Sequence, residues 1–188
     1  MLDELLSRPG VIERCELRAP FGFLALHGGL EAGTAEIAQR AAARAGASVY
    51  AVVQPDGFGW HIPSHRHDPR HSDELADFLA HVDVIVSVHG YGGLRSSGQR
   101  WVTALLGGRN RDLARALATS LRAALPSYRW VDDLDVMPPR LRGVHPDNPV
   151  NRTRLGGVQV ELPPRVRRAP DVDALVDVLA AIAWRFSR

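Results

Sequence analysis

Two histidines and one glutamate stand where apolar segments of the sequence end. His27 directly follows the apolar run 21–26, and Glu31 stands four positions later, beyond two glycines that let the chain turn back. His89 directly follows a second apolar run, 82–88. Two imidazoles and one carboxylate form a ligand set of catalytic zinc, because they leave a coordination position open for water. The alternative is that Glu31 only stabilises the start of a following helix, that His27 is a hydrogen-bonded histidine at a strand end, and that His89 is a partly exposed loop residue.

A third candidate is Glu161, in the alternating segment 157–162. In a strand, Gln159 and Glu161 share one face while the valines and leucine share the other. A carboxylate at the end of such a strand can accept a proton from a metal-bound water as a general base. The alternative is that both polar residues form the exposed face of an edge strand.

Arginines and asparagines precede this strand in the segment 148–154. Arg152 and Arg154 are candidates for binding a carboxylate, because a guanidinium offers it two parallel hydrogen bonds. The alternative is a solvated basic loop. A histidine-rich stretch at 61–71 contains two prolines, which favour an exposed loop on the substrate side, with His61 as the candidate contact. A second metal site is the alternative for this stretch.

Segments typical of strands and of helices alternate along the chain and must position these residues. We expect strands at 21–26, 48–53, 82–88, 101–106 and 157–162, and helices at 34–45, 72–81, 111–125 and 172–186. This alternation predicts an α/β fold, a three-layer α/β/α sandwich with a mostly parallel or mixed sheet. Ligands of such sheets bind at the carboxyl ends of the strands, where His27, His89 and Glu161 are expected.

Composition limits the remaining choices. The length of 188 residues, with 45 % hydrophobic residues, predicts a single globular domain over residues 1–188. Cys15 is the only cysteine, which excludes an intrachain disulfide and a cysteine zinc finger. All 23 basic residues are arginine, so mechanisms that need a lysine are excluded. A net charge of +2 without an aromatic-interleaved basic motif argues against nucleic acid. The absence of a leader pattern or a long apolar run predicts a cytoplasmic protein without a membrane partner.

Four motifs follow one another in the chain: H-G-G-L-E-A-G-T, H-I-P-S, V-S-V-H-G and N-R-T-R-L-G-G-V-Q-V-E-L. In their order and spacing, over roughly residues 24–165, the sequence resembles the zinc-dependent poly-γ-glutamate hydrolases, known from bacteriophages and bacterial genomes. The resemblance implies a compact, carboxypeptidase-like α/β fold. In two places the chain departs from the family pattern. One residue fewer separates the histidine and glutamate of the first motif, and Pro63 stands where threonine is common.

The resemblance also implies roles for individual residues. It assigns the zinc ligands to His27, Glu31 and His89 and the general base to Glu161. Asn151 and Arg152 correspond to contacts with a substrate carboxylate or with the oxyanion.

Together, the residues and the resemblance lead to the hypothesis of a zinc amidohydrolase that cleaves γ-glutamyl linkages of a carboxylate-rich polymer. The expected partner is an anionic, peptide-like or polymeric substrate, with Arg154 as a further contact to its carboxylates. The segment 140–168 would suit such a substrate, because its only acidic residues are Asp147 and Glu161. Two alternatives stay open: a zinc carboxypeptidase or amidase acting on another substrate, such as peptidoglycan fragments, and a catalytically silent domain of the same fold that binds polyanions.

Overall fold

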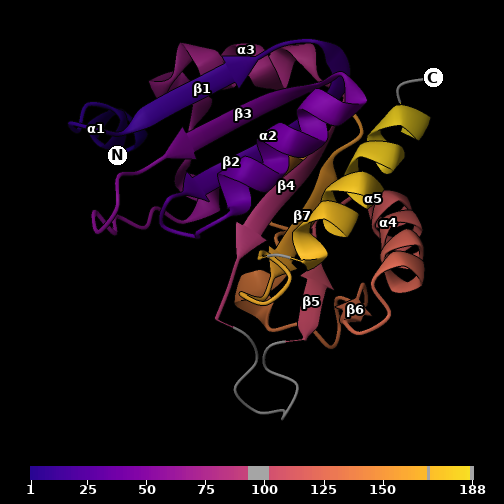
Figure 1. Cartoon of the computed structure of the whole chain (residues 1–188). Coiled ribbons are helices and arrows are strands. Elements are labelled where there is room, and N and C mark those ends of the chain that lie inside the picture. The colour runs from indigo at the N-terminus through magenta and orange to yellow at the C-terminus, as the bar shows by residue number, and fades with distance from the viewer. Residues whose placement is uncertain (93–101, 169, 187–188) are drawn as a thin grey trace.

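The computed structural model describes residues 1–92, 102–168 and 170–186, and its centre is a mixed sheet. Within these residues the seven strands lie in the order β1-β3-β2-β4-β7-β5-β6 (Figure 1). They are β1 (Ile12–Glu16), β2 (Ala19–Gly28), β3 (Ala47–Val53), β4 (Val84–Gly90), β5 (Thr103–Leu106), β6 (Arg129–Val131) and β7 (Gly157–Leu162). Strands β3, β2, β4 and β7 run parallel, whereas β1 and β5 are antiparallel to β3 and β7.

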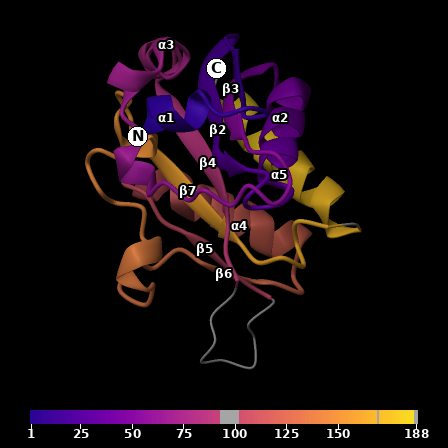
Figure 2. The same ribbon diagram turned by 90° about the vertical axis from the view of Figure 1, so that its left-hand side faces the viewer.

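Helices cover both faces of the sheet. They are α1 (Leu2–Leu6), α2 (Thr34–Ala45), α3 (Asp73–His81), α4 (Arg111–Ala124) and α5 (Asp171–Phe186). Figure 2 shows α1 and α3 on one side of the sheet and α2 and α5 on the other. One apolar cluster joins α2, α4 and α5 to the sheet, and a second joins α1 and α3 to its opposite face. The three-layer α/β/α sandwich predicted from the sequence is therefore confirmed.

The helix and strand boundaries follow from local sequence signals. Helix α2 ends at Gly46, whose φ of +66° suits a residue without a side chain. Helices α3 and α4 begin after Ser72 and Asn110, whose side chains accept hydrogen bonds from backbone N–H groups in the first turn. Strand β2 contributes alternate residues to the two apolar clusters, and this explains why its sequence is a continuous apolar run.

Some elements differ from the prediction. Strands β2 and β4 end two residues beyond the apolar runs, so His27 and His89 lie inside the strands. Strand β1 was not predicted, because its sequence is IERCE and it lies at the edge of the sheet with an alternating exposed face. Trp101, expected to begin a strand, lies outside the described residues. Among the described residues, no helix combines the length and the apolar character needed to cross a bilayer.

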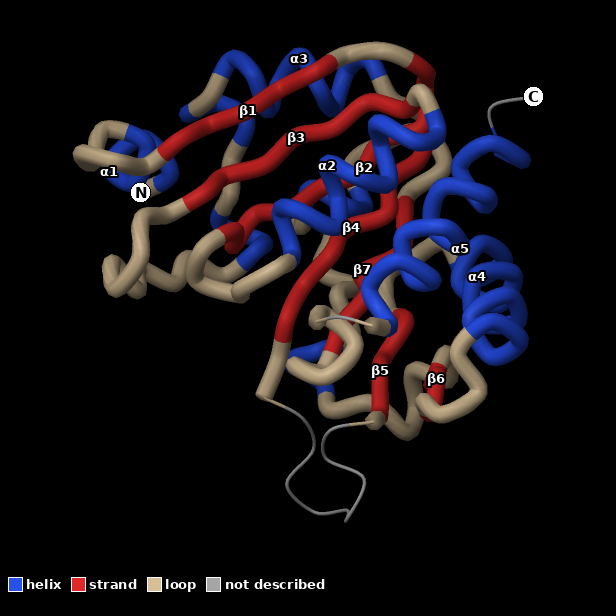
Figure 3. Tube along the Cα trace, in the orientation of Figure 1, coloured by secondary structure: helices blue, strands red, loops and turns tan. Residues whose placement is uncertain are grey.

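The site is positioned by three parallel strands in the middle of the sheet. Strands β2, β4 and β7 are neighbours, as the tube in Figure 3 shows. Because they are parallel, their carboxyl ends meet at one edge of the sheet. Their register places His89 directly opposite Glu161.

Candidate metal centre

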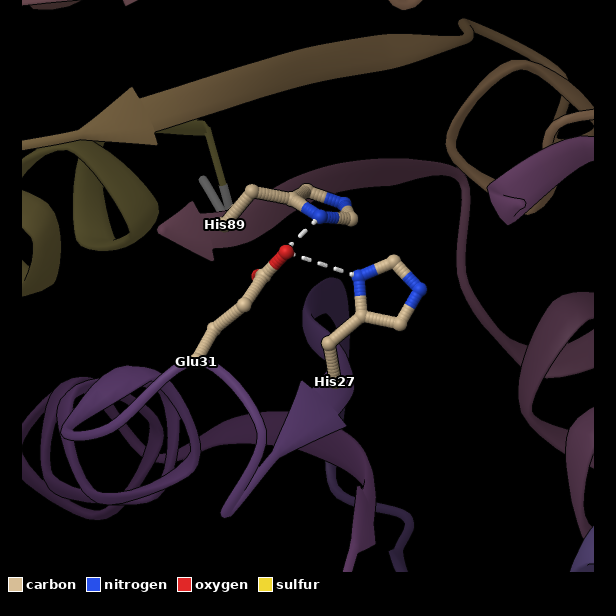
Figure 4. Close-up of side chains that lie close together, drawn as sticks. All are labelled: His27, Glu31 and His89. Atoms are coloured by element: carbon tan, nitrogen blue, oxygen red, sulfur yellow. Dashed lines mark hydrogen bonds and ion pairs between the residues drawn. The ribbon is translucent and has the colours of Figure 1, made fainter. Parts of the chain in front are cut away.

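The imidazoles of His27 and His89 face the carboxylate of Glu31 (Figure 4). His27 Nδ1 lies 3.1 Å from Glu31 Oε1, and His89 Nδ1 lies 3.5 Å from Glu31 Oε2. One ligand atom from each of the three residues lies within 4.8 Å of the others. The structure thus brings together the three residues whose types suggested a metal site, from two strands and one turn.

The second nitrogen of each imidazole is held by a partner outside the cluster. His27 Nε2 donates to the carbonyl oxygen of Ile62 at 2.8 Å, which leaves Nδ1 to face Glu31. His89 Nε2 and the hydroxyl of Ser87 are 2.9 Å apart. Such outer contacts fix the orientation of metal-binding histidines and set which nitrogen can bind the ion.

Glu31 is held by a tight turn and by one backbone N–H group. Its own N–H donates to the carbonyl of His27 at 2.8 Å, and the N–H of Gly90 donates to Glu31 Oε2 at 2.8 Å. The turn requires Gly29, since φ is +78° there and a methyl group would lie 2.0 Å from the carbonyl oxygen of Gln54. The shortened first motif therefore still delivers its glutamate to the cluster.

The electrostatics of the cluster suit a cation. Burial alone would raise the pKa of Glu31, but hydrogen bonds with His27 and His89 outweigh it and hold the pKa well below its usual range. Burial works to lower the pKa of His89, yet the contact with Glu31 raises it above its ordinary value. A half-buried carboxylate between two buried imidazoles fits a divalent metal of zinc type, and these three residues are the ones that would hold it.

Glu161 is a buried carboxylate beside this cluster. It accepts a hydrogen bond from the side-chain amide of Gln159 at 2.7 Å, and Gln159 in turn accepts one from Asn148 at 2.8 Å. Burial raises the pKa of Glu161, and the nearby charge of His89 only partly opposes this. The edge-strand alternative is excluded, because β7 lies between β4 and β5 and all six of its residues are buried.

One cavity of about 700 Å³ connects these groups. The three residues of the cluster line it together with Glu161, Gln159 and Asn148. Its outer part is lined by Pro63, Tyr91, Arg140, Leu141 and Val144 and by the histidines His61, His65 and His145. The cavity therefore combines an acidic and imidazole-rich floor with a mixed apolar and basic rim.

The histidine-rich stretch is only partly the exposed loop that the sequence indicated. His61 lies in the cavity, with its ring centroid 4.8 Å from that of His27, and burial lowers its pKa. His67 is fully buried, with its ring centroid 5.5 Å from that of His27, and burial lowers its pKa to about 3. Neither ring nitrogen of His67 has a hydrogen-bond partner among the described residues. Its polar sequence neighbours gave no signal of this burial.

None of the three candidate residues of the 148–154 segment, Asn151, Arg152 and Arg154, lines the pocket. Arg154 forms two hydrogen bonds of 2.8 and 2.9 Å with Asp83, which precedes β4 at the end of the strand opposite to His89. The structure therefore does not bring Arg154 to the expected substrate site. Asn151 donates to the carbonyls of Gly143 and His145 and so fastens the loop at the rim of the pocket.

Arg152 lines a separate cavity of about 430 Å³ that borders the pocket at His65. The exposed arginine in the pocket itself is Arg140. Sequence reasoning gave Arg140 no specific role, because it lies in a loop without a readable motif. The supporting roles of Ser87 and Asn148 were likewise missed, although Ser87 is a polar residue inside the apolar segment 84–88.

Comparison with known proteins identifies the family of this chain. The family model described as poly-gamma-glutamate hydrolase matches residues 5–170. No curated protein matches the chain.

Solved structures with the same fold extend the comparison. A bacteriophage poly-gamma-glutamate hydrolase is 21 % identical, with a TM-score of 0.80 over 98 % of this chain and 94 % of the other. The zinc-free apo form of YNDL is 21 % identical, with a TM-score of 0.77 over 96 % and 93 %. A metallo-carboxypeptidase from Burkholderia cenocepacia is 9 % identical, with a TM-score of 0.51 over 98 % and 66 %. At these identities the similarity shows a shared fold.

Proposed function

The chain belongs to the poly-γ-glutamate hydrolase family, a family of amide-bond hydrolases, and we propose that it is a zinc-dependent amidohydrolase that cleaves γ-glutamyl linkages of poly-γ-glutamate. The observation that carries the proposal is the placement of Glu161 beside the cluster of His27, Glu31 and His89 in one cavity. A metal-ligand set next to a buried carboxylate is the arrangement that metal-assisted amide hydrolysis needs.

The metal would be held by His27 Nδ1, His89 Nδ1 and the carboxylate of Glu31. Bound zinc supplies Lewis acidity, which polarises an amide carbonyl and lowers the pKa of water to about 7. The Ile62 carbonyl, which accepts from His27 Nε2, and the Ser87 hydroxyl, which is hydrogen-bonded to His89 Nε2, would keep the Nδ1 atoms of both rings available to the metal.

Glu161 serves as the general base and then as the general acid. It takes a proton from the attacking water as the new C–O bond forms, and it delivers that proton to the amide nitrogen as the C–N bond breaks. Burial supports the first step, because a raised pKa makes the carboxylate a better proton acceptor than an exposed one. Gln159 holds one carboxylate oxygen, which orients the group toward the reaction.

The substrate's carboxylates are bound by arginines outside the metal cluster. Arg140 at the rim of the pocket is the nearest candidate for the glutamyl residue at the cleavage point. Arg152 in the bordering cavity suits a carboxylate farther along the polymer, rather than the oxyanion. His61 lies close enough to His27 to contact the same substrate.

The experiment measures zinc content and cleavage together. Purified protein loaded with one equivalent of zinc is incubated with poly-γ-glutamate, and newly released amino groups are counted. We expect one bound zinc and progressive release. Bound zinc without cleavage of this polymer, but with cleavage of peptidoglycan fragments, would contradict the assigned substrate. A protein that neither binds zinc nor cleaves would contradict the enzymatic function and favour a polyanion-binding domain.

A further inference from the structure

Arg167 lines a cavity of about 300 Å³ that shares Glu31, Gly90 and Tyr91 with the substrate pocket, but it does not line the pocket itself. It follows β7 and stands six residues after Glu161. Its Nη1 donates a hydrogen bond to the carbonyl of Ala32, the residue directly after Glu31. A methyl group on Gly33 would lie 3.1 Å from the carbonyl oxygen of Arg167, so the two segments pack closely along their backbones.

The guanidinium of Arg167 also lies directly on Gly90. A methyl group added to Gly90 would lie 2.7 Å from Cζ, 2.8 Å from Nη1 and 3.1 Å from Nε of Arg167. A side chain at this position would therefore require the guanidinium to move away from the backbone of Gly90. The N–H of this same Gly90 donates to Glu31 Oε2 at 2.8 Å.

Arg167 therefore touches both backbone segments that hold the glutamate ligand. One is the peptide that follows Glu31, and the other carries the N–H group bound to its carboxylate. Burial lowers the pKa of Arg167, while the carboxylates of Glu31 and Glu161 act in the opposite direction. Its Nε is buried and has no hydrogen-bond partner among the described residues. The guanidinium thus packs against Gly90 even though one of its N–H donors makes no hydrogen bond there.

We propose that Arg167 is a positioning residue for metal binding, which fixes Glu31 by holding the Ala32 carbonyl and the backbone of Gly90. This role rests on the proposed metal site. Arg167 lies outside all four sequence motifs. An arginine is required rather than any cation, because only a planar guanidinium lies flat on Gly90 while it donates to Ala32.

The first test compares zinc affinity in two neighbouring arginine variants. Arg167→Ala and Arg168→Ala each remove one positive charge, and Arg168 lines the same 300 Å³ cavity as Arg167. Zinc dissociation constants are measured by competition with a chromophoric chelator, and the unfolding temperature of each metal-free protein is recorded. We expect Arg167→Ala to weaken zinc binding about tenfold or more, as loss of an outer-shell contact does. Arg168→Ala should stay within about twofold of the unmodified protein.

The absorption spectrum of the cobalt-loaded protein provides a readout that lowered stability alone would not change. We expect the ligand-field bands to shift in Arg167→Ala and to stay unchanged in Arg168→Ala, because only the first alters the seating of Glu31. Arg167→Lys keeps the positive charge and most of the aliphatic side chain. This variant replaces Arg167→Ala in the measurements if the alanine variant does not fold. It should still bind zinc at least about fivefold more weakly, because it lacks the flat contact.

A double-mutant cycle with Gly90 tests the contact itself. Gly90→Ala should weaken zinc binding in the unmodified protein, because its methyl group displaces the guanidinium. The same substitution should cost little more in the Arg167→Ala background, where the three nearest atoms are gone. If the double variant lost zinc affinity by the product of the two single-variant factors, the two residues would act independently and the inference would be overturned. Unchanged zinc affinity in Arg167→Ala or Arg167→Lys would also overturn it. If the unmodified protein itself bound no zinc, the proposed function would fail instead.

Discussion

His89 and Glu161 stand directly opposite each other on the adjacent parallel strands β4 and β7. One is a ligand of the proposed metal and the other is the proposed base, so the register of two strands sets their separation. Both side chains are buried, and Gln159, two residues before Glu161, supplies the hydrogen bond that orients it. The sheet thus positions the two groups without relying on a flexible loop.

Removal of the outer contact to His89 should weaken metal binding. In Ser87→Ala the hydrogen bond to Nε2 is lost, and the imidazole is no longer fixed toward Glu31. We expect the zinc dissociation constant to rise about tenfold to a hundredfold in a chelator competition. Ser120→Ala on α4 is the matched control, since its hydroxyl only contacts the carbonyl of Ala116. Equal affinity in both variants would show that Ser87 does not support the site.

Zinc binding should release a proton and weaken in acid. Glu31 raises the pKa of His89 above its ordinary value, so a larger share of metal-free protein carries the imidazolium near neutral pH. That proton must leave before Nδ1 can bind the metal, so the apparent affinity should fall as the pH drops below this pKa. Calorimetry in buffers of different ionisation enthalpy measures the proton release directly. No proton release across the titration range of histidine would contradict this assignment.

Substitution of Gln159 should shift the acidic limb of the pH–rate profile. The rate should rise with pH as Glu161 loses its proton, at a pH above the usual glutamate pKa of about 4.3, since burial raises the pKa. Gln159 lowers the pKa of Glu161 by its hydrogen bond, so Gln159→Leu should move the limb to higher pH. Asn148→Ala, one contact farther away, should move it less. A limb that does not move in Gln159→Leu would argue against Glu161 as the titrating base.

Two arginine variants separate substrate binding from fold. Arg140→Ala should raise KM for poly-γ-glutamate about fivefold, the equivalent of ~1 kcal/mol expected for an exposed charge contact. Arg154→Ala removes the same charge at the other end of β4, where Arg154 pairs with Asp83, and should leave KM within about twofold. Steady-state kinetics at fixed ionic strength would make the comparison. A larger rise in KM for Arg154→Ala than for Arg140→Ala would contradict the placement of the substrate at the carboxyl ends of the strands.

The sequence predicted the fold and the grouping of His27 and His89 with Glu31, because both depend on residue patterns that are typical of strands. Continuous apolar runs mark strands that are buried on both faces, and His27 and His89 stand at the ends of such runs. Glu161 could be predicted for a related reason, since it lies near the end of an alternating strand. In each case the chemistry lies within a few residues of a regular element.

The supporting residues could not be predicted in the same way, because long-range contacts define them. Asn148 reaches Gln159 across a loop, and Arg167 reaches Ala32 from a segment 135 positions away. Arg154 stands beside Arg152 in the motif but points to Asp83, a residue whose position in space the local pattern does not contain. Loop geometry rather than residue type decides which arginine faces the pocket.

The variant Glu161→Gln separates metal binding from catalysis when bound zinc and poly-γ-glutamate cleavage are measured in the same preparation. The substitution keeps the size of the side chain and removes its ability to accept the proton. We expect one zinc per chain, an unchanged fold by circular dichroism, and a turnover reduced at least about a hundredfold. Near-normal turnover by the zinc-loaded variant would contradict the role of Glu161 as the base.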